Sequence, residues 1–153
     1  MDLLLWRHAE AQEALPDGDD LLRALTPRGE KQAARMAAWL DRQLPEGTRI
    51  LVSPARRAEQ TAMALGRKYK LRQKMGPGAT VDQVLQLANW PDGRGVTLVV
   101  GHQPVLGQVV ARLLGINGAE CSVRKGAVWW LRHRLRDGIS QITLVSVQSP
   151  DVL

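Results

Sequence analysis

The chain has 153 residues, of which 44% are hydrophobic and 24% charged, with one cysteine, Cys121, and a net charge of +6. One cysteine excludes an intrachain disulfide framework, and the N-terminal apolar run from Leu3 to Trp6 is too short for a signal peptide or a membrane span. We therefore expect a cytoplasmic protein with a single domain over residues 1–153, whose positive charge favours phosphometabolites, nucleic acids or acidic proteins as partners.

The first predicted element is a strand over residues 3–7, which is followed by a polar loop. Thr26 and Pro27 then predict the start of a helix, with Thr26 as its cap and Pro27 at the first helical position. Apolar residues continue at helical spacing until residues 45–47, whose proline and glycine end the helix.

The middle of the chain alternates between strand and helix patterns. In order, these are a strand over 49–53, a helix from near Ala55 to Lys68, a short helix over 81–87, a strand over 96–100 and a helix over 105–114. The strand over 96–100 is apolar without alternation, as expected when helices cover both faces of a sheet. This alternation predicts an α/β domain with a mainly parallel sheet.

The C-terminal part follows a different pattern. Two strand-like segments, Val128 to Leu135 and Ile139 to Val147, flank Asp137 and Gly138, which is a hairpin signal. We expect this hairpin to complete the sheet with an antiparallel edge. The predicted fold class is thus an α/β three-layer sandwich, with a mainly parallel sheet flanked by helices.

Three predicted strands end in residues suited to bind an anion. Arg7 and His8 follow the first strand, Arg57 follows the second, and His102 follows the third. Ligands of α/β folds bind beyond the carboxyl ends of the strands, so we expect these side chains to meet at one site. Two arginines and two histidines there indicate a site for phosphate or a phosphate-like anion.

His8 is the predicted nucleophile, because a neutral imidazole, with a free pKa of about 6.5, can attack phosphorus near neutral pH. Arg7 and Arg57 are expected to bind the non-bridging phosphoryl oxygens, since the planar guanidinium meets phosphate bidentately. Arg56 neighbours Arg57 at the same predicted helix start, so only one of the two should point inward, and we favour Arg57.

His102 precedes Pro104, which we expect at the first helical position, and therefore lies at a helix N-terminus that favours anions. A protonated His102 could donate to the phosphoryl group, and the alternative role for its side chain is to cap the helix. His133 alternates with apolar residues in a predicted strand, so we assign it a packing role.

No pattern in the chain predicts a metal or a cofactor. Histidine and cysteine spacings typical of zinc sites are missing, the loop with Asp17, Asp19 and Asp20 lacks the spacing of a calcium site, and no glycine-rich nucleotide loop occurs. The basic run over 67–74 predicts a solvated helix end and loop. Its only aromatic residue is Tyr69, so we do not expect a nucleic-acid partner.

Four motifs in order resemble the histidine phosphatase superfamily, which has the phosphoglycerate mutase-like fold. They are Arg7-His8-Ala9, the Leu-Thr-Pro-Arg-Gly run at 25–29, the segment from Ser53 through Arg57-Ala58 to Thr61, and Gly101-His102. Residues 7–11, 20–26, 52–61 and 100–104 are most similar to the SixA-type phosphohistidine phosphatases.

This resemblance implies a metal-independent phosphatase in which His8 accepts the phosphoryl group. It also implies that Arg7, Arg57 and His102 form the phosphate pocket. Arg23 and Glu10 lie in segments that carry the resemblance and are further candidates for substrate binding.

The sequence departs from the superfamily pattern at two places. Ala9 replaces the usual glycine, which is tolerated if the backbone there has a negative φ. Residues 70–95 contain no glutamate, whereas mutase and phosphomonoesterase branches usually place a general-acid glutamate in this segment. An alkoxide leaving group needs such an acid, but imidazole is a much weaker base and leaves from phosphohistidine without one.

We therefore expect a phosphohistidine phosphatase whose substrate is a histidine-phosphorylated protein, admitted by an open pocket and aided by the basic surface. The alternative enzyme is a phosphomonoesterase on a sugar phosphate or nucleotide, with Glu10, Asp20 or Asp82 as the acid. The alternative of another class is a non-catalytic module that binds phosphate or nucleic acid.

Overall fold

The computed structural model describes residues 1–118 and 120–153. Within these residues one six-stranded sheet has the order β3-β2-β4-β1-β5-β6. The strands are β1 (Asp2–Arg7), β2 (Arg49–Val52), β3 (Lys70–Leu71), β4 (Val96–Gly101), β5 (Val128–Arg136) and β6 (Ile139–Gln148). The helices are α1 (Pro27–Gln43), α2 (Arg56–Met63), α3 (Val81–Ala88) and α4 (Val105–Leu114), with short 3-10 helices η1 (Asp20–Leu22), η2 (Gln73–Met75) and η3 (Pro150–Val152).

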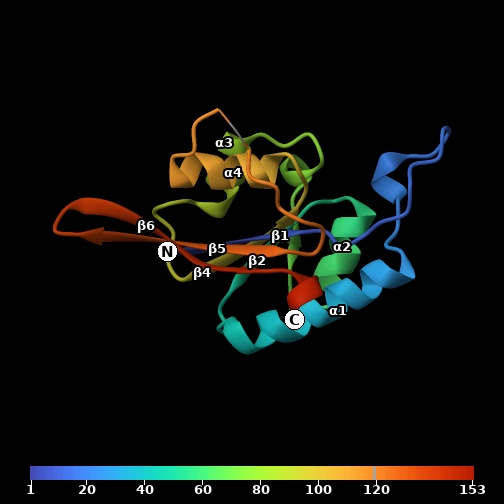
Figure 1. Cartoon of the computed structure of the whole chain (residues 1–153), viewed down its shortest axis with the longest axis horizontal. Helices are drawn as coiled ribbons and strands as arrows, with labels where there is room; N and C mark the ends of the chain where they lie inside the picture. Colours follow the sequence, from blue (N-terminus) through green and yellow to red (C-terminus); the bar gives the residue numbers. More distant parts are fainter. Residues whose placement is uncertain (119) are drawn as a thin grey trace.

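The sheet is mainly parallel, as predicted. β1 pairs in parallel with β4, β4 with β2, and β2 with β3, whereas β5 runs antiparallel to both β1 and β6. The helices α3 and α4 cover one face of the sheet, and α1 and α2 cover the other (Figure 1). The α/β three-layer sandwich with an antiparallel C-terminal hairpin is therefore confirmed.

Both faces of β1 are buried, because its side chains alternate between the two helical layers. Leu3 and Leu5 belong to the apolar cluster on the side of α4, and Leu4 and Trp6 belong to the cluster that contains Met36 of α1. All four β1 side chains are fully buried. This explains why the strand is apolar at every position until the charged pair at its end.

The start of α1 is confirmed at Thr26 and Pro27. The Thr26 hydroxyl accepts a hydrogen bond from the Gly29 backbone amide, which is the usual cap of a first turn. A Cβ atom at Gly29 would lie 1.9 Å from the Glu10 carbonyl oxygen, so only glycine allows this close approach. The first turn of α1 therefore fixes the loop that leaves β1.

The helix expected from near Ala55 to Lys68 is shorter than predicted, since α2 ends at Met63. Gly66 has a φ of +69°, which a helix does not continue through. The Arg67 guanidinium then donates to the carbonyl oxygens of Leu44 and Pro45 just beyond α1. These tertiary contacts turn the chain toward β3, so the basic run contains a short edge strand that the sequence pattern did not predict.

A second correction concerns Pro104. It lies at the N-cap of α4 rather than at the first helical position. The side chain of Gln103 performs the capping, because its Oε1 atom accepts a hydrogen bond from the Gly107 amide at 2.7 Å. In the described part of the chain, no helix is both long and apolar enough to cross a membrane.

Candidate active site

The parallel register brings the carboxyl ends of β1, β4 and β2 to one edge of the sheet. Arg7 lies opposite Gly101, and the His8 amide donates to the Gly101 carbonyl oxygen at 3.0 Å. On the other side of β4, the Ser53 amide donates to the Val100 carbonyl oxygen at 3.0 Å. The side chains that follow these strands therefore meet, as the sequence predicts.

His8 is held in the orientation that a nucleophile needs. Its Nδ1 atom lies 2.7 Å from the Ala9 carbonyl oxygen, which can only accept, so Nδ1 carries the hydrogen and Nε2 keeps its lone pair. Burial, with the nearby charges of Arg57 and Arg7, lowers the pKa of His8 from 6.5 to about 4. The imidazole is therefore neutral near pH 7.

Ala9 has no positive φ, so the alanine fits where the superfamily usually has glycine. Its side chain is fully buried in a small cluster with Leu25 and Ala33. The Ala9 amide donates to the Thr61 hydroxyl at 3.0 Å, which ties the loop after β1 to α2. The backbone at Ala9 therefore tolerates alanine in place of the usual glycine.

His102 lies beside His8, with a distance of 5.3 Å between the two ring centroids. Its Nε2 atom is 2.7 Å from the Ser53 hydroxyl oxygen, and its buried Nδ1 atom has no hydrogen-bond partner within the described residues. Burial, together with the nearby positive charges of Arg57 and Arg7, lowers the pKa of His102 from 6.5 to about 3. A protonated His102 is therefore not the form that this environment favours.

Arg57 points inward and Arg56 does not, as expected. The Arg57 side chain is only 4% exposed, and it donates to both the backbone oxygen and the carboxylate of Asp20. Arg7 donates to the Val123 carbonyl oxygen at 3.0 Å. The Nε atoms of Arg7 and Arg57 are buried and have no hydrogen-bond partner among the described residues, so the protein leaves both donors unpaired.

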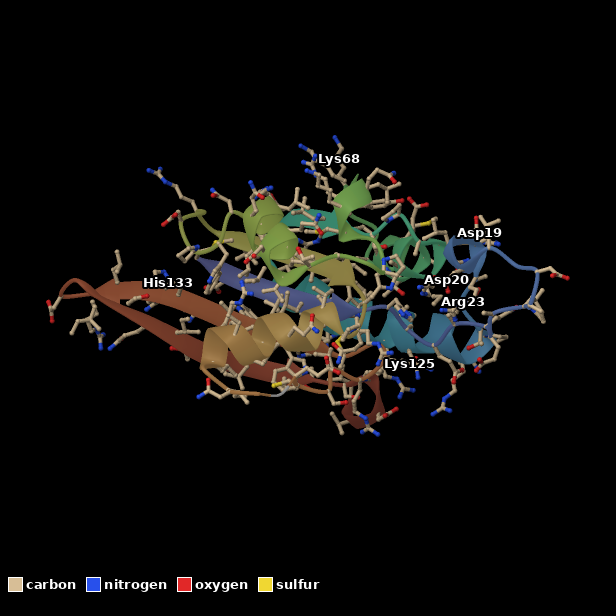
Figure 2. The ribbon with its side chains drawn as sticks, turned by 90° about the horizontal axis from the view of Figure 1, so that it is seen from above. Asp19, Asp20, Arg23, Lys68, Lys125 and His133 are labelled. Carbon is tan, nitrogen blue, oxygen red and sulfur yellow. The ribbon has the colours of Figure 1, made fainter. Side chains whose placement is uncertain are left out.

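These groups line a cavity of about 250 Å³. The lining residues include His8, His102 and four cations, namely Arg7, Arg23, Arg57 and Lys125. Figure 2 shows Arg23 and Lys125 at the same end of the molecule, opposite the hairpin that carries His133. So much positive charge around two histidines makes the cavity an anion site.

Arg23, a further candidate for substrate binding, lines the cavity. Its Nε atom donates to the Asp20 carboxylate at 2.9 Å, and another guanidinium nitrogen donates to the Gln12 carbonyl oxygen at 2.8 Å. The Arg23 and Arg57 guanidinium groups together hold the pKa of Asp20 below its ordinary value, although partial burial opposes them. Asp20 is thus an ionised partner of the two arginines.

Glu10, the other further candidate for substrate binding, is not among the residues that line the cavity. Its Oε2 atom accepts a hydrogen bond from the Thr26 hydroxyl at 2.7 Å. The carboxylate is turned toward the first turn of α1, because that turn packs against the loop after β1. Glu10 therefore has a structural role at the start of the helix.

Asp82 also lies outside the cavity. Its exposed carboxylate pairs with Arg112 of α4. Of the carboxylates in the described chain, Glu13 alone lines the cavity, and it was not predicted from the sequence. Lys125 was also missed, because it lies in a loop before β5 with no motif around it.

His133 has the packing role that was expected. Its ring lies 5.7 Å from that of Trp90, and its Nε2 atom is 2.5 Å from the Ser140 hydroxyl oxygen. The acidic loop is also occupied by local contacts, since Asp19 accepts from the Leu21 amide at the start of η1. Residues 1–118 and 120–153 contain no group of three histidine, cysteine or acidic side chains that could hold a metal ion.

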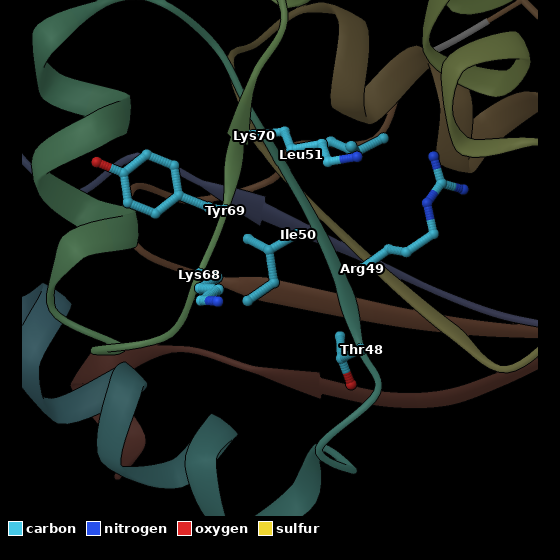
Figure 3. Close-up of a pocket in the computed structure, with 7 residues that line it drawn as sticks. All are labelled: Thr48, Arg49, Ile50, Leu51, Lys68, Tyr69 and Lys70. Atoms are coloured by element: carbon cyan, nitrogen blue, oxygen red, sulfur yellow. The ribbon is translucent and has the colours of Figure 1, made fainter.

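A larger hollow of about 560 Å³ lies at the other end of β2 (Figure 3). It is lined by residues 48–51 and 68–70, so part of the basic run borders it. The Tyr69 hydroxyl donates to the Glu59 carboxylate at 3.0 Å. No histidine, cysteine or carboxylate is among the described residues that line this hollow, so it lacks the nucleophile and the acid that the cavity of His8 contains.

A model of the histidine phosphatase superfamily (branch 1) matches residues 3–78. The phosphohistidine phosphatase SixA of Escherichia coli (strain K12) is 36% identical over 123 residues, covering 74% of each chain. A structure of protein histidine phosphatase SixA complexed with tungstate has a TM-score of 0.75 at 28% identity and covers 99% of each chain. A structure from Agrobacterium tumefaciens assigned to SixA has a TM-score of 0.81 and covers 97% of each chain, and its 23% identity shows the fold alone.

Proposed function

The chain belongs to the histidine phosphatase superfamily, and from this premise we propose that it is a phosphohistidine phosphatase of the SixA type. One observation carries the proposal. The cavity places a neutral His8 among cations, while Glu10 and Asp82 have partners away from the cavity and Asp20 is paired with Arg23 and Arg57. This arrangement suits a leaving group that needs no strong general acid, and imidazole is such a group.

In the first step, His8 Nε2 attacks phosphorus in line with the bond to the substrate's histidine. The Arg7 and Arg57 guanidinium groups bind the non-bridging oxygens and neutralise their charge. The hydrogen on His8 Nδ1 stays bonded to the Ala9 carbonyl oxygen throughout, so the phosphorylated ring is held protonated on that nitrogen. Water then cleaves the phosphoryl–His8 bond, and the ring leaves as a neutral imidazole.

His102 stabilises the transferring group as a neutral donor. The Ser53 hydroxyl accepts a hydrogen bond from the Ala55 amide, and its own hydrogen can be donated to His102 Nε2. In that tautomer His102 Nδ1 carries a hydrogen that can be donated to a phosphoryl oxygen. This replaces the protonated His102 of the sequence-based interpretation, and it agrees with a pKa of about 3.

The substrate we propose is a phosphorylated histidine presented by another protein in the cytoplasm, without a metal ion. The cavity of about 250 Å³ is small, and Arg23 and Lys125 stand at its border as cations that an acidic partner would meet. E. coli SixA, which is 36% identical over its matched residues, is described as a phosphohistidine phosphatase. The cations at the cavity support a protein substrate with an acidic surface, and the relative supports phosphohistidine as the group that is cleaved.

The test is turnover with a chelator present, on a histidine-phosphorylated protein and on p-nitrophenyl phosphate side by side. We expect a strong preference for phosphohistidine, loss of both activities in His8→Ala, and full activity in His133→Gln as the matched histidine control. Retained turnover in His8→Ala would refute the covalent mechanism. A requirement for an added metal ion would refute the proposal that catalysis proceeds without one.

One observation favours a second candidate function, which is that of a phosphomonoesterase. Glu13 lines the cavity and is a carboxyl group that could protonate an alkoxide. Higher turnover on a sugar phosphate than on phosphohistidine would favour this candidate. Binding of phosphate without any turnover would favour the non-catalytic module, which a buried nucleophile such as His8 argues against.

A further inference from the structure

We propose that Glu13 binds the leaving histidine of the substrate, by accepting a hydrogen bond from the ring nitrogen that does not carry phosphorus. The inference rests on the proposed function, since it concerns the leaving group of that reaction. It assigns to the cavity's carboxylate a role in substrate specificity rather than in proton donation to an ester oxygen.

Phosphoryl transfer between two histidines exchanges one P–N bond for another. His8 Nε2 supplies the electron pair for the new bond, and the pair of the broken bond stays on the substrate's ring nitrogen. That ring leaves as neutral imidazole only if its other nitrogen already carries a hydrogen. No proton has to move during the step, but both rings need an acceptor for the N–H that each keeps.

The structure provides that acceptor for His8, because Nδ1 lies 2.7 Å from the Ala9 carbonyl oxygen. The substrate's ring approaches from the open side of the cavity and needs an equivalent acceptor there. The other charged side chains that line the described cavity are Arg7, Arg23, Arg57 and Lys125, which only donate. Gln103 also lines the cavity, but its Oε1 atom already accepts from the Gly107 amide, so Glu13 is the lining side chain with a free acceptor.

Glu13 is held at the border of the cavity by the backbone that precedes it. Ala11 forms an antiparallel bridge with Leu25, and the Gln12 amide donates to the Ala24 carbonyl oxygen at 2.8 Å. The Gln12 carbonyl oxygen in turn accepts from Arg23 at 2.8 Å. The residue directly before Glu13 is thus fixed to a side chain that itself lines the cavity.

The Glu13 carboxylate is also available. No hydrogen bond or ion pair engages it among residues 1–118 and 120–153, and the side chain belongs to an exposed residue. The neighbouring carboxylates differ in this respect, because Asp20 pairs with Arg23 and Arg57 and Glu10 accepts from Thr26. Four cations line the same cavity, but none of them is paired with Glu13. Its carboxylate is therefore free to bind a positively charged ring.

The experiment compares Glu13→Gln with the wild type on phosphohistidine and on p-nitrophenyl phosphate, whose leaving group has no ring N–H. Glu46→Gln, at the turn after α1, is the matched control. We expect Glu13→Gln to lower kcat/KM on phosphohistidine by roughly tenfold or more, because the variant loses a charged hydrogen-bond partner of the substrate. We expect its kcat/KM on the ester to stay within about twofold of the wild-type value. Unchanged ester turnover also shows that the variant folds.

A pH profile separates this role from a merely structural one. Glu13 favours the protonated ring in the bound substrate, so the alkaline fall of kcat on phosphohistidine should move to lower pH in Glu13→Gln. Equal losses on both substrates, or no loss and no movement of the profile, would overturn the inference. Failure of the wild type to hydrolyse phosphohistidine would instead refute the proposed function, so the two failures are distinguishable.

Discussion

The Ser53 hydroxyl oxygen lies 2.7 Å from His102 Nε2, and both groups are buried at neighbouring strand ends. Ser53 follows β2 and His102 follows β4, so the pair depends on the parallel register of these strands. The same hydroxyl oxygen accepts from the Ala55 amide at 3.1 Å, just before α2. One serine therefore links the start of the helix that carries Arg57 to the ring that faces His8.

Replacing Ser53 with alanine should lower activity through the tautomer of His102. Without the hydroxyl, Nε2 loses its partner and the ring is no longer biased to carry its hydrogen on Nδ1. We expect a loss of about tenfold to a hundredfold in kcat/KM, the size seen when a group that orients an active-site histidine is removed. The measurement is steady-state kinetics together with nitrogen NMR of the His102 ring.

Ser140→Ala is the matched control for Ser53→Ala. Ser140 forms the same kind of serine–histidine contact with His133, on the hairpin far from the cavity (Figure 2). We expect its kcat/KM to equal that of the wild type. An unchanged His102 tautomer together with full activity in Ser53→Ala would contradict the role assigned to Ser53.

Arg57→Lys should lose most of the activity even though it keeps the charge. Lysine has no planar fork, and it cannot donate at once to Asp20 and to a phosphoryl oxygen as the Arg57 guanidinium can. We expect kcat/KM to fall by about a hundredfold or more, which corresponds to about 3 kcal/mol of transition-state stabilisation. Kinetics on phosphohistidine and on p-nitrophenyl phosphate checks this.

Arg56→Lys is the control at the neighbouring position. Arg56 is exposed, and we expect its substitution to change kcat/KM by less than twofold. Full activity in Arg57→Lys would mean that the positive charge of this helix start, rather than the geometry of Arg57, determines phosphate binding, and an equal loss in Arg56→Lys would mean that the inward position of Arg57 is not what matters.

Much of the site could be predicted from the sequence, because strand ends are visible in it. The apolar runs before Arg7 and His102 locate two ends of the sheet, and the parallel topology of an α/β fold then brings such ends together. This inference needs only periodicity and topology. The shared helix start of Arg56 and Arg57 indicates only that one of them points inward, and the preference for Arg57 agrees with the motif that carries the family resemblance.

The remaining features depend on tertiary contacts that no local pattern contains. Glu10 lies next to the Arg-His pair in the sequence, but its carboxylate turns to Thr26 on α1. Glu13 lines the cavity because the loop before it is bonded to the segment at 23–25. Lys125 lines the cavity because the amide of the next residue, Gly126, donates to the carbonyl oxygens of Arg7 and His8. The hydroxyl that contacts His102 Nε2 likewise comes from the end of another strand.

Gly29→Ala should destabilise the protein and loosen the loop that carries Glu13. The added Cβ would lie 1.9 Å from the Glu10 carbonyl oxygen, so either the loop or the first turn of α1 has to move. We expect a loss of about 1–3 kcal/mol in the free energy of unfolding, measured by denaturant titration. Activity on phosphohistidine should fall more than activity on p-nitrophenyl phosphate.

Gly47→Ala is the matched control for Gly29→Ala. A Cβ there has no heavy atom within 4 Å, and the φ of Gly47 lies outside the left-handed region. We expect its free energy of unfolding to equal or slightly exceed that of the wild type, since alanine restricts the unfolded chain. Equal destabilisation in the two variants would show that the close approach at Gly29 is not what matters.

The stability of the protein should fall as the pH drops from about 6.5 toward 4. Burial lowers the pKa of His8 to about 4 and that of His102 to about 3, whereas both histidines titrate near 6.5 in the unfolded chain. In this window the unfolded chain therefore binds more protons than the folded one, and the free energy of unfolding decreases with falling pH. Above about pH 7 both states are neutral at these rings, and this contribution to the pH dependence vanishes.

His8→Gln tests this linkage, because it removes one of the two titrating groups. We expect the free energy of unfolding of the wild type to decrease by up to about 3 kcal/mol per histidine between pH 7 and pH 4.5, and the variant to show a shallower slope. Denaturant titrations at a series of pH values measure both slopes. Identical slopes would mean that His8 becomes protonated in the folded protein near pH 6.5, and that its ring is not held neutral by burial and the arginines around it.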